Sequence, residues 1–526
     1  MQKKIIGVVG SGLSSLACVS RLINEPGVSI VIIDDFKDNN AEINSNLQLF
    51  KNEIIKTKNY FDRLKIYYSN FKKTAYKLKI YKNYFNIEVF NQKIFSEDKR
   101  LNIYTSQSYG GFSKIWGGVI NKPLKEDLIN WPVSFIEIEK YFNVITDLLT
   151  KFKKIDTLNE ENNIIPNGKV SKICNSFYKK IFINKKKIEL NNIYFQKTNL
   201  ALLKKKNNSF YCNECGFCMH GCPSGLIFNS TFLFDHYLTL ENVKYIQGKV
   251  YSYKEENKIL SVKYLDHKDD HYKNLTLDYL FVGAGCINTS MININSIKEL
   301  ENKKVNICTN DNYVSLVLLK NIKTEPLIFE KNSLAQISFV IKEDITKKNK
   351  AYFQLYEFSD IVIFKFLRLF INKFFFKIFL NLIPFLNKIL FAQFFLNSED
   401  SSTLILKKDN GKFNLSVGKV QKKSEKIINN LINKINNEKN LKIKMPKFFL
   451  KKFYTGESYH LGSSFKMQKN NNIYSTDIFG KPYGFKKVSI IDSTVLPTLP
   501  SNSHSYLTMC NAYRITDAIM NKNFKF

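Results

Sequence analysis

The chain has 526 residues, of which 44% are hydrophobic and 14% aromatic, a composition that excludes a disordered protein. At this length two domains are expected, because single hydrophobic cores rarely grow beyond about 300 residues. The formal net charge is +33, but the lysines are spread along the whole chain, often beside asparagine. Because no basic-aromatic cluster or known reader motif accompanies this charge, it does not predict nucleic-acid binding.

The first residues have the pattern of a dinucleotide-binding unit. The apolar strand KIIGVVG leads into GSGLSS, a helix-like LACVSRLI and a second strand, VSIVIIDD. Gly10 permits the tight turn, Gly12 lets the backbone approach a pyrophosphate, and the N-terminus of the helix faces the anion. Ser15 stands where a third glycine is usual, at a position that serves helix packing. Asp34, or its neighbour Asp35, would accept a hydrogen bond from a ribose hydroxyl.

The same N-terminal segment bears on the cellular compartment. Lys3 and Lys4 precede an apolar run, as in a signal peptide, but glycines interrupt the run and a second strand follows it. We therefore expect a cytoplasmic protein, in which cysteines stay reduced and serve as ligands or core residues.

Four of the nine cysteines fall within eleven residues, in CNECGFCMHGCPSG. Cys212, Cys215, Cys218 and Cys222 follow the C-x₂-C-x₂-C-x₃-C-P spacing of bacterial ferredoxins. Zinc fits less well, because structural zinc usually takes two separated pairs of ligands. In ferredoxins the fourth cysteine of such a run serves a second cluster, and this chain has one run. Two alternatives stay open, an iron-sulfur cluster or a cysteine-rich turn without metal; His220 is a minor candidate ligand.

Further motifs follow along the chain. SYGGFSKIWGG contains two pairs of glycines, and DYLFVGAGCINT is a second apolar strand that ends in glycine. Near the C-terminus, YHLGSSFKM carries His460, IIDST ends a strand at Asp492, and PSNSHSYLTM carries His504 before a helix-like tail.

The order of these motifs resembles the glucose-methanol-choline oxidoreductase family, flavoenzymes that oxidise alcohols. The resemblance is to the bacterial branch that has a cysteine cluster in the FAD domain, and it is weak or absent over residues 36–100 and 300–450. It implies a bound FAD. The residues that it places at the cofactor are Gly10, Gly12, Ser15, Asp34, Gly110, Gly111, Ser113, Trp116, Gly117, Val250, Gly283, Gly285 and Asp492.

Alcohol oxidation by a flavin needs a proton acceptor beside the ring, a role that suits histidine. Of the six histidines, His267 and His271 lie in a polar segment that predicts an exposed turn, and His220 lies in the cysteine run. His460 and His504 fall in the two C-terminal segments where the family has its catalytic residues. We expect one of this pair to take the hydroxyl proton and the other to orient the alcohol.

Residues 361–396 are densely apolar, but no uncharged stretch reaches the ~20 residues that a membrane-spanning helix needs. Four basic residues recur within the segment at near-helical spacing: Lys365, Arg368, Lys373 and Lys377. The pattern predicts either an interfacial helix with peripheral membrane contact or a buried helical pair.

We therefore predict an α/β fold with a Rossmann-like FAD-binding domain built from discontinuous segments, 1–135, 206–300 and 452–526. Residues 136–205 and 301–451 would form an α+β substrate domain, an antiparallel sheet with helices on one face. The predicted function is FAD-dependent oxidation of the CH–OH group of a small alcohol, sugar or lipid-like molecule, with an electron acceptor that the sequence leaves open. The alternatives are a flavin and iron-sulfur electron-transfer protein and an inactive membrane-peripheral scaffold.

Overall fold

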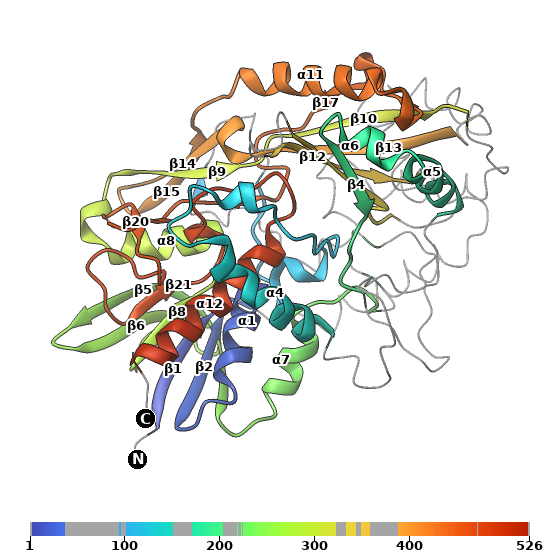
Figure 1. The fold of residues 1–526 in the computed structure, drawn as a ribbon. Coiled ribbons are helices and arrows are strands. Elements are labelled where there is room, and N and C mark those ends of the chain that lie inside the picture. Colours follow the sequence, from blue (N-terminus) through green and yellow to red (C-terminus); the bar gives the residue numbers. More distant parts are fainter. Residues whose placement is uncertain are drawn as a thin grey trace.

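The computed structural model has a mixed α/β architecture built around two large sheets (Figure 1). One sheet is largely parallel and the other is antiparallel, so the predicted fold class is confirmed. The structure describes residues 3–36, 94–95, 101, 103–150, 171–202, 218, 222, 225–321, 333–342, 349–357, 388–470 and 472–523.

The first sheet has the strand order β21-β8-β1-β2-β5-β6-β7, parallel as far as β5 and antiparallel beyond it. Its central strands are runs of apolar residues, KIIGVV and VSIVIID, because helices and an antiparallel extension cover the two faces. The strands are β1 (Lys4–Val9), β2 (Val28–Asp34), β5 (Val243–Glu256), β6 (Ile259–Asp266), β7 (Tyr272–Leu277), β8 (Tyr279–Val282) and β21 (Val488–Ile490).

Three helices pack together beside this sheet, α1 (Leu13–Leu22), α4 (Phe135–Thr150) and α12 (Ser505–Asn523). Helix α4 contacts α12 through stacked rings of Phe142 and Tyr506, whose centroids are 5.6 Å apart. The helix thus shares a hydrophobic core with α1 and α12, and the predicted domain boundary at residue 136 stays a prediction. A further helix, α8 (Cys286–Ser296), follows β8 and packs against β5.

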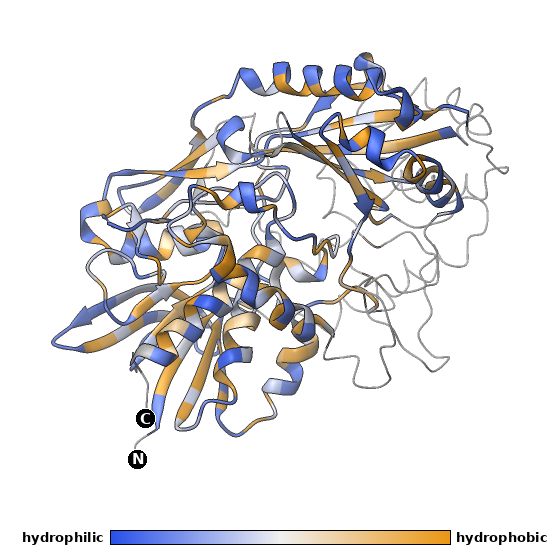
Figure 2. Cartoon of the chain, in the orientation of Figure 1, coloured by the Kyte–Doolittle hydropathy of each residue, from blue (hydrophilic) through white to orange (hydrophobic). Residues whose placement is uncertain are grey.

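The second sheet has the order β16-β10-β13-β12-β11-β4, and all its pairs are antiparallel. Helices α5 (Lys172–Phe182) and α11 (Lys423–Asn437) cover one face. Figure 2 shows that the strands are largely hydrophobic, whereas α11 alternates between polar and apolar residues. The strands are β4 (Ile193–Lys197), β10 (Asn312–Leu319), β11 (Ile337–Lys342), β12 (Asn349–Tyr356), β13 (Ile389–Leu396) and β16 (Ile443–Lys444).

Strand β13 corrects the prediction made for residues 361–396. The part of that segment up to residue 387 lies outside the described residues, but Ile389–Leu396 form a central strand and not a helix. Alternate side chains of ILFAQFFL are buried on opposite faces of the sheet, which period-2 geometry permits and helical geometry does not. Within the described part of the chain, no helix is long and apolar enough to cross a membrane.

A third sheet, of order β18-β9-β14-β15-β3, packs against the same core as α1 and α12. Asn310 and Asp311 follow β9, a strand of this sheet, and lead directly into β10. The remaining elements are β3 (Ile94–Phe95), β9 (Lys304–Thr309), β14 (Thr403–Asp409), β15 (Lys412–Val417), β17 (Lys451–Lys452), β18 (Leu461–Gly462), β19 (Lys466–Met467), β20 (Ser475–Thr476), α6 (Lys185–Glu189), α7 (Thr231–Tyr237) and short 3₁₀ turns at Gly111–Lys114, Lys125–Leu128, Lys298–Leu300, Ser398–Asp400, Lys439–Leu441, Lys447–Phe449 and Ser493–Val495.

Candidate active site

The turn between β1 and α1 has an open side at Gly12. This residue caps the helix N-terminus with φ −71° and ψ −176°, a conformation that any residue adopts. A Cβ atom added there would meet no described atom within 4 Å. Gly10 differs, because its φ is +93° and an added Cβ would lie 2.6 Å from the carbonyl oxygen of Gly283. Glycine is thus required by the fold at position 10, whereas at position 12 it leaves space beside free helical N–H groups.

The glycine pair at 110 and 111 lies against this open side. The Gly110 N–H donates to Ser11 Oγ at 2.7 Å, and Ser113 Oγ donates to the Gly110 carbonyl oxygen at 2.6 Å. A Cβ atom on Gly111 would lie 3.8 Å from the Cα atom of Gly12. The predicted cofactor residues of both motifs are therefore neighbours in space.

The turn after β8 and the end of β21 complete the same region. Ser15 Oγ donates to the carbonyl oxygens of Val9, at 3.1 Å, and Gly283, at 3.3 Å, so this residue joins the two turns. Gly285 has φ +82° and open space where a Cβ would lie, and its N–H donates to Asp492 Oδ2 at 2.9 Å. Burial raises the pKa of the Asp492 carboxyl, which also accepts hydrogen bonds inside the protein. Its carboxylate therefore fastens β21 to the start of α8.

The carboxylate of Asp34, at the end of β2, is half-buried and accepts two hydrogen bonds within the protein. Its Oδ2 accepts hydrogen bonds from Ser11 Oγ at 2.5 Å and from the Tyr245 hydroxyl at 3.1 Å. Burial raises the pKa of Asp34 to about 6, although these hydrogen bonds oppose the rise. Asp34 thus links the Gly12 turn to β5, and its contact with a ribose stays a prediction.

Asp35 has three partners, and one of them, His267, is less exposed than the sequence predicts. Its carboxylate accepts from His267 Nε2 at 2.8 Å and Gln107 Nε2 at 2.9 Å, and lies 3.2 Å from Lys249 Nζ. Burial opposes ionisation, but the His267 bond and the Lys249 charge outweigh it and lower the pKa of Asp35 to about 2. The prediction of an exposed turn is wrong for His267, whose side chain is only 5% exposed, because its backbone N–H bonds Gln247 and turns the chain inward.

The segment after the Gly110 turn leads to a cavity. Trp116 and Gly117 line it, while the indole N–H of Trp116 donates to the Phe228 carbonyl oxygen at 2.6 Å. The indole nitrogen is therefore engaged within the protein. Val250, predicted to lie at the cofactor, is a buried residue of β5 that pairs with Tyr264 of β6, and its cofactor role stays a prediction.

Another wall of the cavity is the second face of the antiparallel sheet. Unlike the face that packs on α5 and α11, this one carries amide and hydroxyl groups among its apolar residues. The Tyr356 hydroxyl donates to Gln354 Oε1, Gln354 Nε2 donates to the Tyr352 hydroxyl at 3.1 Å, and Asn312 Oδ1 is buried without a partner among the described residues. The sheet residues that line the cavity are Asn312, Gln354, Tyr356, Gln393 and Phe395.

The sequence motifs did not predict that these sheet residues line a cavity, although two glutamines within apolar strands could have indicated it. Gln354 and Gln393 are isolated amides within the apolar strands AYFQLY and ILFAQFFL, and they are direct cross-strand neighbours. Polar residues in buried strands need partners, so such isolated glutamines point to a polar network or a ligand.

The two predicted catalytic histidines meet at the edge of this cavity. The rings of His460 and His504 have centroids 4.8 Å apart and planes at 82°. His460 lines the cavity and stacks on Phe395 with centroids 4.9 Å apart. His504 is 7% exposed, and its Nδ1 is buried with no hydrogen-bond partner among the described residues. Burial lowers the pKa of His504 to about 4, so its ring is neutral at physiological pH.

No family model and no curated protein matches this sequence, but solved structures resemble it over 99% of the chain. Pyridoxine 4-oxidase from Mesorbium loti has a TM-score of 0.62 at 8% identity, covered over 100% of its chain. A formate oxidase has a TM-score of 0.59 at 10% identity. A formate oxidase variant from Aspergillus oryzae RIB40, studied for its FAD modification, has a TM-score of 0.60 at 10% identity. The similarity covers 99% of each of these two chains. The chain has the glucose-methanol-choline oxidoreductase fold. At these identities the likeness shows the fold alone.

Within the glucose-methanol-choline fold, two of the four clustered cysteines can be placed. Cys218 and Cys222 are partly buried against the main core, and Cys222 Sγ accepts from the Leu226 N–H at 3.4 Å. Cys212 and Cys215 lie outside the described residues, as does His220. Among the residues that are described, no three His, Cys, Asp or Glu side chains are grouped so as to hold a metal ion.

The buried state of His504 predicts a pH-dependent stability. A histidine whose folded pKa lies near 4 takes up a proton in the unfolded chain first, so stability falls as pH drops from 6.5 towards 4. Between pH 7 and pH 5 the wild type should lose about 2 kcal/mol more of unfolding free energy than His504→Asn. Urea unfolding of both proteins at the two pH values measures this difference, and equal losses would show that His504 is not desolvated.

Proposed function

We propose that this protein is an FAD-dependent oxidoreductase that oxidises the CH–OH group of a small polar molecule. The observation that carries the proposal is the unexplained glycine at position 12. Neither its backbone conformation nor its packing requires glycine, whereas the phosphates of a dinucleotide at a helix N-terminus do. Gly285 leaves a second open space beside the same turn.

The residues around this space fit FAD. The N-terminus of α1 and the backbone near Gly12 and Gly285 would hold the pyrophosphate, and Asp34 would accept from a ribose hydroxyl. The segment from Gly110 to Gly117 leads from there to the cavity, so it would lie along the flavin end. When bound, the flavin supplies an acceptor for the hydride that leaves the carbinol carbon.

The histidines supply the remaining chemistry. The hydroxyl proton needs a neutral base at the cavity, and His460, whose ring contacts that of His504, offers an imidazole there. The unpartnered Nδ1 of His504 is explained if a ligand hydroxyl lies near it. A protein that served only as a scaffold would have no need for a buried, neutral histidine without a partner.

The cavity wall indicates the substrate class. Asn312 Oδ1 is buried without a partner among the described residues, and Gln354, Tyr356 and Gln393 bring further amide and hydroxyl groups to the same wall, so a substrate with hydrogen-bonding groups would suit this wall better than an apolar one. The solved structures of the same fold are named as pyridoxine and formate oxidases. We therefore infer that the substrate is a small polar alcohol and not a lipid.

Substitution of Gly12 tests the cofactor site. Gly12→Val would place a Cβ atom in the open space, where it meets no described atom within 4 Å, so the variant should weaken FAD binding by at least about 100-fold while the protein still folds. Calorimetric titration of FAD into the apoprotein measures the affinity. The control is Gly411→Asn, which alters the exposed β14–β15 turn at a residue with φ +75°, a conformation that asparagine tolerates. Undiminished flavin affinity in Gly12→Val would refute the site.

Substitution of the histidines tests the chemistry. His460→Ala and His504→Ala should each retain FAD but slow anaerobic flavin reduction by an alcohol by on the order of 10² or more, the usual scale for loss of a general base. Stopped-flow absorbance gives the rate in a single turnover. Wild-type rates in both variants would favour an electron-transfer protein whose histidines are incidental.

One observation favours a redox role for the cysteine run. The residues that follow it bond directly to the cofactor turn, since Ser230 Oγ donates to the Ser11 carbonyl oxygen at 2.6 Å and the Ser230 N–H donates to Ser113 Oγ at 3.0 Å. A cluster held by Cys212, Cys215 and Cys218 would thus be linked to the flavin site through the following chain segment and the hydrogen bonds of Ser230. We infer that such a cluster would pass electrons to an external acceptor, which makes the enzyme a dehydrogenase.

Iron analysis tests this second proposal. Anaerobically purified wild type from iron-replete cells should contain iron, and Cys215→Ser should lose the iron and acceptor-linked turnover. Flavin reduction by the alcohol should persist in that variant, because it needs only the histidine side of the site. Wild-type protein without iron would reduce the run to a cysteine-rich turn.

A further inference from the structure

Asn310 joins the histidine site to three backbone carbonyl groups. It lies between β9 and β10 and is almost completely buried. Its Nδ2 donates to the carbonyl oxygens of Leu396 at 2.6 Å, Pro500 at 3.2 Å and Leu499 at 3.4 Å. Its Oδ1 lies 3.1 Å from Nδ1 of His460.

These carbonyl groups fix the orientation of the amide. If the Asn310 amide were turned over, Oδ1 would face three oxygens that only accept hydrogen bonds, and a buried acceptor would be left without a donor. The observed orientation therefore presents an acceptor to His460. An acceptor at this place requires a proton on Nδ1, and because a neutral imidazole carries one proton, Nε2 then keeps the lone pair.

We propose that Asn310 is a positioning residue that holds His460 in the Nδ1–H tautomer, so that His460 Nε2 is the atom that accepts the substrate proton. The tautomer rests on the hydrogen bonds around Asn310 alone, whereas the role of Nε2 rests on the function proposed above. This assigns the two histidines, since His460 is the base and His504, whose Nδ1 has no partner among the described residues, orients the alcohol.

Two further contacts keep the His460 ring in this arrangement. Phe395 stacks on it at 4.9 Å with an angle of 24°, and His504 meets it at 82° on another side. A 180° flip of the ring would bring a carbon atom to the position of Nδ1 and break the Asn310 bond, and a smaller rotation would also disturb both ring contacts. The geometry is thus prepared before any substrate enters, which lowers the cost of ordering the base.

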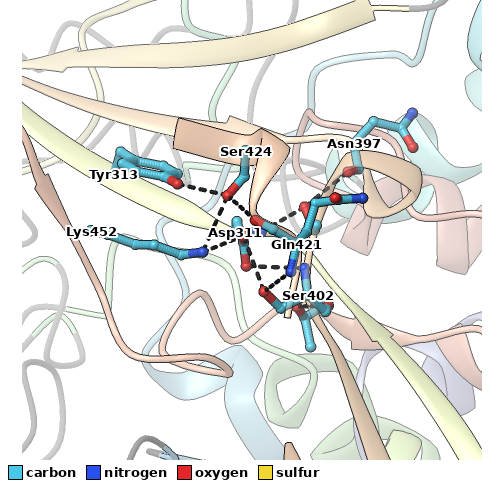
Figure 3. Close-up of polar contacts among 9 residues, drawn as sticks. Asp311, Tyr313, Asn397, Ser402, Gln421, Ser424 and Lys452 are labelled. Carbon is cyan, nitrogen blue, oxygen red and sulfur yellow. Dashed lines mark hydrogen bonds and ion pairs between the residues drawn. The ribbon is translucent and has the colours of Figure 1, made fainter. Parts of the chain in front are cut away.

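A buried ion pair holds the backbone beside Asn310 (Figure 3). Asp311, whose side chain is 1% exposed, accepts from Lys452 Nζ at 2.5 Å and from the Ser402 N–H at 3.2 Å. Lys452 Nζ also donates to Ser424 Oγ at 3.2 Å, and the Tyr313 hydroxyl lies 2.8 Å from the same Oγ. The loop that carries Asn310 is therefore fastened to the sheet and to α11.

Nitrogen NMR of ¹⁵N-histidine-labelled full-length protein reads the tautomer directly. The chain has six histidines, and His460→Asn identifies the His460 signals by their loss. In wild type we expect Nδ1 of His460 to have the shift of a protonated nitrogen and Nε2 that of an unprotonated one, with or without FAD. A protonated Nε2 and unprotonated Nδ1 would overturn the assignment, whether or not the protein oxidises an alcohol.

Variants of Asn310 separate positioning from folding. Asn310→Leu removes the acceptor, so the Nε2–H form should appear and flavin reduction should slow about 10-fold or more through kcat rather than KM. Asn397→Leu, which removes another buried amide, should leave the His460 tautomer unchanged. An unchanged His460 tautomer in Asn310→Leu would overturn the proposal. A variant that loses FAD while its His460 tautomer is as expected would bear only on the proposed function.

Discussion

The close approach of two strand-to-helix turns is the constraint on which the rest of the structure depends. Strands β1 and β8 are parallel neighbours, so the turns at their carboxyl ends meet, and Gly10 lies too near the Gly283 carbonyl oxygen to carry a side chain. This contact places the open side of Gly12 and the start of α1 beside Gly285. The Gly110 turn then docks on Ser11, and the chain from there reaches the cavity.

The antiparallel sheet supplies the other half of the site because its two faces have different chemistry. Alternate residues of β13 point to α5 and α11 on one side and to the cavity on the other. A sheet that was apolar on both faces would pack equally well but would offer a ligand no hydrogen bonds. The amides and hydroxyls of the inner face therefore indicate selection for a ligand at that surface.

Local motifs predicted some features of the fold and of the candidate site but not others. The β1–α1–β2 unit, the strand before Asp492 and the pairing of His460 with His504 followed from short sequence patterns in a recognisable order. The burial of His267, the strand at β13 and the role of Asn310 did not, because each depends on partners far away in the sequence. Hydrogen bonds such as that between Asn310 and His460 join residues 150 positions apart and leave no periodic trace.

The absorbance spectrum of anaerobically purified protein, recorded before and after addition of a panel of small polar alcohols, tests the central claim most directly. The account predicts one oxidised flavin per chain, released by denaturation as FAD, and bleaching of its bands by at least one alcohol of the panel. Protein that shows no flavin bands, and retains none after incubation with excess FAD, would contradict it.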